Sequence, residues 1–103
     1  MAWFKIYAGM GGSFGGAIYH GTYEYNDAQE ASLEAYSLAV EDYEGYAGYY
    51  GVLSRENCRE DIIESFGYEP TDEEVEDRYQ EEIESWIEYY ARPATSEHDI
   101  DDK

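Results

Sequence analysis

The chain has 103 residues, and 25 acidic residues against 6 basic ones give it a formal net charge of -19. A chain with this charge is repelled by nucleic-acid phosphates and by anionic membrane surfaces, which excludes both as expected ligands. Because 43% of the residues are apolar and 17% are aromatic, the composition differs from that of a disordered acidic tail. We therefore expect a single folded domain whose partners are basic proteins or cations.

The first 23 residues contain no acid, and they predict a β-hairpin. Residues 2–8 and 17–25 are rich in the aromatic and β-branched residues that are typical of strands. The glycine-rich connection 9–16 lacks the Lys-Ser or Lys-Thr pair of a phosphate-binding loop and precedes a strand, so we interpret it as a hairpin loop. An isolated hairpin is only marginally stable, so it must pack on helices or gain another strand.

A helix is predicted to begin at Asn26 or Asp27, where Asp27 and Glu30 have the spacing of a capping box, and to end at Gly45 or Gly48. Its apolar face on a helical wheel comprises Ala28, Leu33, Tyr36, Ala39, Val40 and Tyr43, and Ala31, Ala35 and Leu38 extend this surface around one side. Residues 45–53 fit either a loop or a third short strand, and the sequence leaves this choice open.

Two further helices are predicted in the second half of the chain. The first is capped by Ser54 and ends at Phe66 before Gly67, and its apolar residues recur at spacings of three and four: Cys58, Ile62, Ile63 and Phe66. The second runs from Asp72 to Ala91 after a capping box of Thr71 and Glu74, and its apolar stripe comprises Val75, Tyr79, Ile83, Trp86, Ile87 and Tyr90. Pro93 ends this helix, and residues 94–103 predict a disordered acidic tail. The expected architecture is therefore an α+β domain over residues 1–93, with an N-terminal β-hairpin packed on about three helices.

A stripe of carboxylates on the last predicted helix carries the functional prediction. On a helical wheel, six acids fall within an arc of roughly 100° and span about 22 Å of the helix axis. A single DNA strand places one phosphate every ~3.4 Å, which is a comparable density of negative charge. Three acids of the first predicted helix would add a parallel row if the two helices packed side by side. The predicted partner-binding acids are Glu73, Glu74, Asp77, Glu81, Glu84, Glu88, Glu30, Glu34 and Glu41.

Tyr49 and Tyr50 complete the predicted binding surface, because they stand in a glycine-rich segment and tyrosine is enriched at interfaces. No pair of carboxylates stands out as a catalytic pair, and the sequence predicts neither an enzyme nor a cofactor or metal site. Cys58 is the single cysteine, so no disulfide forms within the chain. With no apolar run of 18 residues and no signal segment, we expect a cytoplasmic protein.

The chain resembles, in its character rather than in any defining motif, the small acidic DNA-mimic inhibitors of bacteriophages and mobile elements, which include anti-restriction and anti-CRISPR proteins. The resemblance implies a basic nucleic-acid-binding protein or ribonucleoprotein as the partner, with a CRISPR effector as first choice and a restriction enzyme as second. Two other hypotheses remain open: an acidic adaptor or antitoxin-like module that binds a basic protein without competing with DNA, and a merely solubilising acidic surface. The sequence is compatible with a monomer or a dimer, since the hairpin edge is unpaired.

Overall fold

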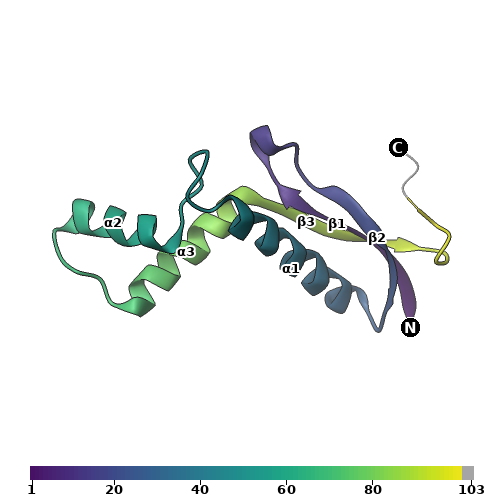
Figure 1. Ribbon diagram of the computed structural model, residues 1–103. Helices are drawn as coiled ribbons and strands as arrows, with labels where there is room; N and C mark the ends of the chain where they lie inside the picture. The colour runs from purple at the N-terminus through teal and green to yellow at the C-terminus, as the bar shows by residue number, and fades with distance from the viewer. Residues whose placement is uncertain (101–103) are drawn as a thin grey trace.

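The structure is a computed structural model that describes residues 1–100, and its strands form a single antiparallel sheet in the order β2-β1-β3 (Figure 1). This arrangement of one sheet and three helices confirms the predicted α+β class. The elements in chain order are β1 (Ala2–Met10), a short 3-10 turn η1 (Gly12–Phe14), β2 (Ile18–Tyr25), α1 (Ala28–Tyr46), α2 (Arg55–Phe66), α3 (Asp72–Trp86) and β3 (Ile87–Ala94).

β1 is the central strand, and one of its faces is buried against α1. Side chains alternate between the two faces of a strand, which places Phe4, Ile6, Ala8 and Met10 on the helix side, where at most 6% of each is exposed. The helix meets them with a row of small, fully buried side chains, Ala31, Ala35 and Ala39. These alanines let α1 approach the sheet closely.

The third strand lies where the sequence predicted the end of a helix. α3 ends at Trp86, five residues before the predicted end, and Ile87–Ala94 pairs with β1 along its whole length. The backbone N–H of Gly11 donates to the carbonyl of Trp86 at 2.7 Å, which fixes the start of the strand. Residues 87–94 form a strand and not a continued helix, because they include β-branched and aromatic residues and because β1 has an edge with which they can pair.

The region 45–53 does not form a strand. α1 continues to Tyr46, and residues 47–51 form a turn that leads into α2. The buried face of α1 is centred on one side of the predicted apolar surface, because Ala31 and Ala35 at its extension are fully buried, whereas Leu33 is 60% exposed and Ala28 is exposed. The sheet selects the flat alanine face of this helix, and its larger side chains flank the contact.

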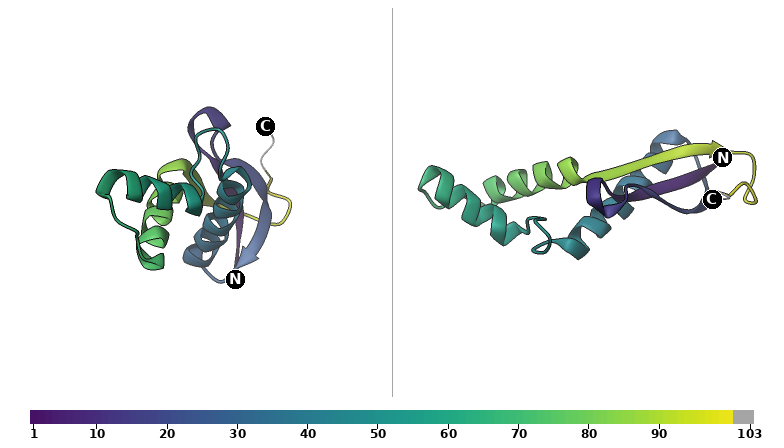
Figure 2. Two further views of the ribbon diagram at one scale, coloured as in Figure 1. Left: turned by 60° about the vertical axis from the view of Figure 1, so that its left-hand side comes forward. Right: turned by 90° about the horizontal axis from the view of Figure 1, so that it is seen from above.

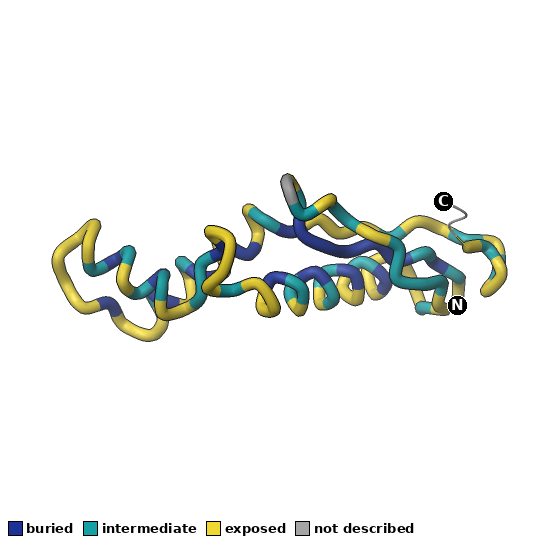
Figure 3. The backbone as a smooth tube through the Cα atoms, turned by 45° about the horizontal axis from the view of Figure 1, so that its top comes forward, coloured by how far each residue is buried: buried dark blue, intermediate teal, exposed yellow. Residues whose placement is uncertain are grey.

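α2 and α3 pair with each other and project beyond the sheet, so the molecule is elongated (Figure 2). The radius of gyration is 16.6 Å, against about 13 Å for a compact domain of this length. Buried side chains continue from the sheet into this projection through Tyr43, Val52, Cys58 and Tyr79, while most of its backbone lies at exposed positions (Figure 3).

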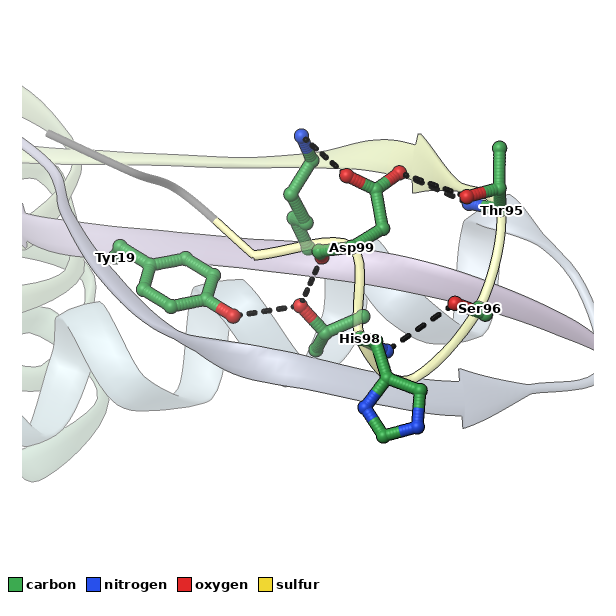
Figure 4. Close-up of polar contacts among 7 residues, drawn as sticks. Tyr19, Thr95, Ser96, His98 and Asp99 are labelled. Carbon is green, nitrogen blue, oxygen red and sulfur yellow. Dashed lines mark hydrogen bonds and ion pairs between the residues drawn. The ribbon is translucent and has the colours of Figure 1, made fainter.

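The segment after β3 folds back over the open face of β1 and β2. Asp99 forms an ion pair with Lys5 at 3.4 Å, and its backbone carbonyl accepts a hydrogen bond from the Thr22 hydroxyl at 2.8 Å (Figure 4). The Thr95 N–H donates to the Asp99 carboxylate, and this bond lowers the pKa of Asp99 more than its pairing with Lys5 does. The sequence predicted a disordered tail from residue 94, but residues 94–100 make these contacts, and 101–103 lie outside the described residues.

Two glycine substitutions are expected to change the free energy of unfolding in opposite directions, one in the hairpin and one in α1. A Cβ at Gly9 would lie 2.6 Å from the backbone oxygen of Gly16, so Gly9→Ala is expected to lower the free energy of unfolding by about 1–3 kcal/mol. A Cβ at Gly45 in α1 meets nothing within 4 Å, so Gly45→Ala is expected to raise it by up to about 1 kcal/mol. Urea denaturation measures both, and equal effects would contradict the described hairpin.

Candidate acidic binding surface

The α2–α3 pair with its flanking residues, 54–86, is here named the acidic arm. It carries just over half of the 25 acidic residues of the chain but only three bases, all arginines. Both helices begin with a complete capping box, Ser54 with Asn57 and Thr71 with Glu74, as the sequence predicted for the second of them. Helix starts that are well capped hold the arm in place despite its modest core.

All three arginines of the arm form ion pairs with acids of the arm itself. Arg55 of α2 pairs with Glu76 of α3 at 2.5 Å, and this hydrogen bond raises the pKa of Arg55. Arg59 pairs with Glu69 in the connecting loop, which raises the pKa of Arg59.

Arg78 clamps the two helices from the α3 side. It reaches Asp61 of α2 at 3.3 Å and Glu82 of its own helix at 2.6 Å. Burial lowers the pKa of Arg78, but the bonds to these two carboxylates raise it by more, so the net shift is upward. All three positive charges are therefore paired with other acids of the arm, and no arginine forms an ion pair with Glu73, Asp77 or Glu81 within residues 1–100.

The outer face of α3 presents Glu73, Asp77, Glu81 and Glu84 to solvent. Among residues 1–100, Glu73, Asp77 and Glu81 form no hydrogen bond or ion pair. Glu84 stands near the C-terminal end of α3, where a carboxylate is disfavoured by the helix dipole and where the last turn contains no base. Like charges three and four residues apart also weaken a helix, so this face is costly for folding.

Glu74 was predicted to join that row, but its carboxylate has a structural role. It accepts hydrogen bonds from the Thr71 backbone N–H at 3.2 Å and from the Tyr68 hydroxyl at 2.5 Å. These bonds, with that of Tyr68 the strongest, lower the pKa of Glu74 below its ordinary value, and the pKa of Tyr68 is raised in return. Glu74 is thus a cap of α3 first and a surface charge second.

The structure also separates the other predicted acids from the row. Glu88 lies on β3 and not on a helix, because α3 ends at Trp86. Glu30, Glu34 and Glu41 lie on α1, which does not run beside α3 (Figure 1). The two helices meet where the ring of Tyr43 packs on that of Tyr79 and where the Gln80 side-chain amide donates to the Tyr36 hydroxyl. Glu30 further serves as a cap, since its carboxylate accepts hydrogen bonds from the backbone and side-chain amides of Asn26 at 3.2 and 3.0 Å.

Tyr49 and Tyr50 lie on the turn between α1 and α2 and are 67% and 80% exposed. Tyr50 has a φ of 55°, the left-handed region that a bulky side chain rarely adopts. Its ring lies at the rim of an aromatic cluster, 6.5 Å from the ring of Phe14 and 6.2 Å from that of Tyr46. Backbone strain at an exposed tyrosine costs folding free energy that a turn joining two helices does not require.

An aromatic groove between α2 and α3 was missed by the sequence reasoning. Its volume is about 230 Å³, and it is lined by Ile62, Phe66, Tyr68, Glu74, Asp77, Arg78 and Glu81. Phe66 was predicted to lie on the buried face of its helix, but it is 70% exposed and packs on Tyr68 at 6.2 Å. The sequence signal was available, since Phe66 is the last residue of its helix and stands directly before the helix-ending Gly67.

Other chemistry finds little support in the described residues. Cys58 is fully buried, and burial raises the pKa of its thiol, which keeps it in the unreactive protonated form. Within residues 1–100, no group of three or more His, Cys, Asp or Glu side chains is placed to hold a metal ion. No helix in that range is long and apolar enough to cross a membrane.

Comparisons of the chain with protein-family models, with curated proteins and with solved structures found no match.

The repulsion on the outer face of α3 predicts that neutral variants are more stable than the natural chain. Asp77→Asn, Glu81→Gln and Glu84→Gln together are expected to add about 1 kcal/mol, which raises Tm by roughly 4–8 °C at low salt. Because salt screens exposed charges, the gain is expected to disappear at about 1 M NaCl. Thermal unfolding followed by circular dichroism at both salt concentrations measures this difference.

Glu74→Gln is the matched control, and it is expected to lower Tm instead. Because the pKa of Glu74 is depressed in the folded state, its stabilising effect is fully present above the ordinary value of 4.5. That effect is lost as the pH falls through the depressed pKa, so the difference from the natural chain should vanish in acid. A rise in Tm on replacing Glu74 would show that it belongs to the repulsive row.

Proposed function

We propose that this protein is a DNA-mimic inhibitor, which binds the basic nucleic-acid-binding surface of a bacterial defence complex and blocks its access to DNA. The observation that carries the proposal is the outer face of the acidic arm, where the carboxylates of Glu73, Asp77 and Glu81 form no hydrogen bond or ion pair among residues 1–100, while the three arginines of the arm are paired with other acids. Folding gains nothing from this face, and a cationic partner would offset its repulsion.

The dimensions of the arm support mimicry of a phosphate strand. From Glu73 to Glu84 the axis of α3 rises about 16 Å, with a carboxylate every ~4–6 Å, against ~3.4 Å for the phosphates of one DNA strand. The molecule measures 54 × 27 × 15 Å along its principal axes, so the arm is narrow enough to enter a channel built for nucleic acid. An RNA-guided CRISPR effector has such a channel, and it is rich in Arg and Lys.

The groove beside the stripe fits the side chain of an arginine. A guanidinium group stacks on aromatic faces and pairs with carboxylates, and the exposed rings of Phe66 and Tyr68 lie next to Asp77 and Glu81. Arginine is also the residue with which such effectors read DNA bases and backbone. The proposed contact therefore combines a row of charges, which attracts the partner over a distance, with a groove that selects arginine over lysine.

Charge reversal on the arm tests this function. Asp77→Lys, Glu81→Lys and Glu84→Lys together should abolish inhibition of DNA cleavage in a panel of purified RNA-guided nucleases and restriction enzymes. The natural chain should inhibit at least one of them, and excess duplex DNA should relieve the inhibition. Glu74 is left unchanged, because its loss would disturb the start of α3.

The matched control carries the same change in charge on α1, as Glu34→Lys, Glu41→Lys and Glu44→Lys. If total charge alone matters, the two triple variants should lose inhibition equally. Full inhibition by the arm variant would overturn the mimic proposal. Inhibition that depends on the arm but is not relieved by excess duplex DNA would favour the acidic adaptor instead. The aromatic groove between α2 and α3 would then be its contact with the partner.

The strained turn gives a second test of the binding surface. Tyr50→Asn should leave stability unchanged or raise it by about 1 kcal/mol, since Asn tolerates left-handed backbone, and should weaken inhibition about tenfold. Tyr49→Asn removes the neighbouring ring without relieving strain and is expected to weaken inhibition with no gain in stability. Urea denaturation and the cleavage assay together separate the two effects, and unchanged inhibition by both variants would remove the turn from the surface.

A further inference from the structure

The outer edge of β3 is unoccupied by any described part of the chain. The sheet order places β3 at the margin (Figure 2). Five of its residues, 88–90, 92 and 93, are exposed. The segment after β3 does not cover this edge, because it turns towards Lys5 and Thr22 on the other side of the sheet (Figure 4). An exposed edge strand is a template for pairing with another chain.

The register with β1 shows which backbone groups of β3 point outward. Pro93 lies opposite Phe4 and has no N–H, so this pair cannot be a hydrogen-bonded pair of the antiparallel ladder. The bond from Gly11 N–H to the carbonyl of Trp86 obeys the same alternation, since even-numbered residues face β1. The N–H and C=O groups of Tyr89 and Ala91 therefore point away from β1, towards the open edge.

The sequence of this edge is complementary to itself. When two copies of β3 run antiparallel with Tyr90 opposite Tyr90 of the second copy, Tyr89 lies opposite Ala91 of that copy, and their outward backbone groups bond. In the same register Glu88 lies opposite Arg92 of the second copy, and this pair occurs twice. Within residues 1–100 neither Glu88 nor Arg92 has an ion-pair partner; Arg92 lies over the rings of Tyr7 and Tyr90.

We propose that the protein forms a symmetric dimer in which β3 pairs with β3 of a second copy and the sheet continues across the two chains. An apolar groove of about 280 Å³ flanks this edge, bordered by Leu33, Tyr36 and Tyr89, and a partner strand lying along β3 covers it. Leu33 is 60% exposed in one chain, and this second copy accounts for its position on the surface.

Charge favours this edge over other surfaces for self-association. β3 carries one acid and one base, and the acidic arm joins β3 at the first residue of the strand, Ile87. Antiparallel pairing sends the two arms in opposite directions, with Trp86 of one chain about 27 Å along the strand from Trp86 of the other. This separation exceeds the ~8 Å screening length at physiological salt, so repulsion between the arms is weak.

Charge-swap variants of the full chain test the dimer by sedimentation equilibrium over a dilution series. The natural chain should sediment as a dimer, and Arg92→Glu and Glu88→Arg should each raise the dimer dissociation constant about tenfold or more, because each places two like-charged pairs at the interface. The double variant Glu88→Arg with Arg92→Glu should restore dimerisation. This rescue is specific to pairing between chains, since the two side chains form no ion pair within one chain.

Circular dichroism of each variant controls for folding, and Glu88→Arg keeps the stacking of Arg92 on Tyr7 and Tyr90 intact. A monomer at every concentration would overturn the proposal. A dimer that tolerates both single substitutions, or one that the double variant fails to restore, would place the interface elsewhere and overturn it equally. The result does not depend on the proposed inhibition, which is read from DNA cleavage.

Discussion

Pairing of β1 with two neighbouring strands is the interaction on which the rest of the molecule depends. β1 lies within the acid-free first 23 residues, so the centre of the sheet forms without burying a carboxylate. It fixes the start of β3 through Gly11 and Trp86, and this in turn fixes where α3 ends and in which direction the acidic arm leaves the sheet. The alanine face of α1 closes the same core from one side.

The position of the carboxylates follows from this division of the chain. Repulsion within a net charge of -19 opposes a compact shape. More than half of the acids lie on the acidic arm, which projects from the sheet and has a thin core. Three arginines form ion pairs that hold the arm together, and these pairs neutralise their charges. The outer face of α3 with Glu73, Asp77, Glu81 and Glu84 is negative, and in the proposed complex the exposed aromatic rings beside it add specificity that charge alone does not give.

The sequence predicted the elements well where local signals decide them. The starts of α1, α2 and α3 follow capping residues, and the class of the fold follows from the hairpin and the apolar stripes. It failed at Ile87–Ala94, because Ile87 and Tyr90 fit the helical period and the pairing with β1 is not local. The spacing of Asp27 with Glu30 and of Thr71 with Glu74 predicted their capping roles, but the helical wheel still assigned Glu30 and Glu74 to the binding surface, because it groups side chains by direction alone.

The central claim is that the acidic arm competes with DNA for a basic partner. The most direct measurement is capture of partners from bacterial lysate by the tagged full chain at low and at high salt, with and without duplex DNA, read by mass spectrometry. The account predicts that a nucleic-acid enzyme is retained at low salt, is displaced by duplex DNA, and is absent when Asp77, Glu81 and Glu84 are replaced by lysine. Retention of a basic protein that DNA does not displace, or no retention at all, would contradict it.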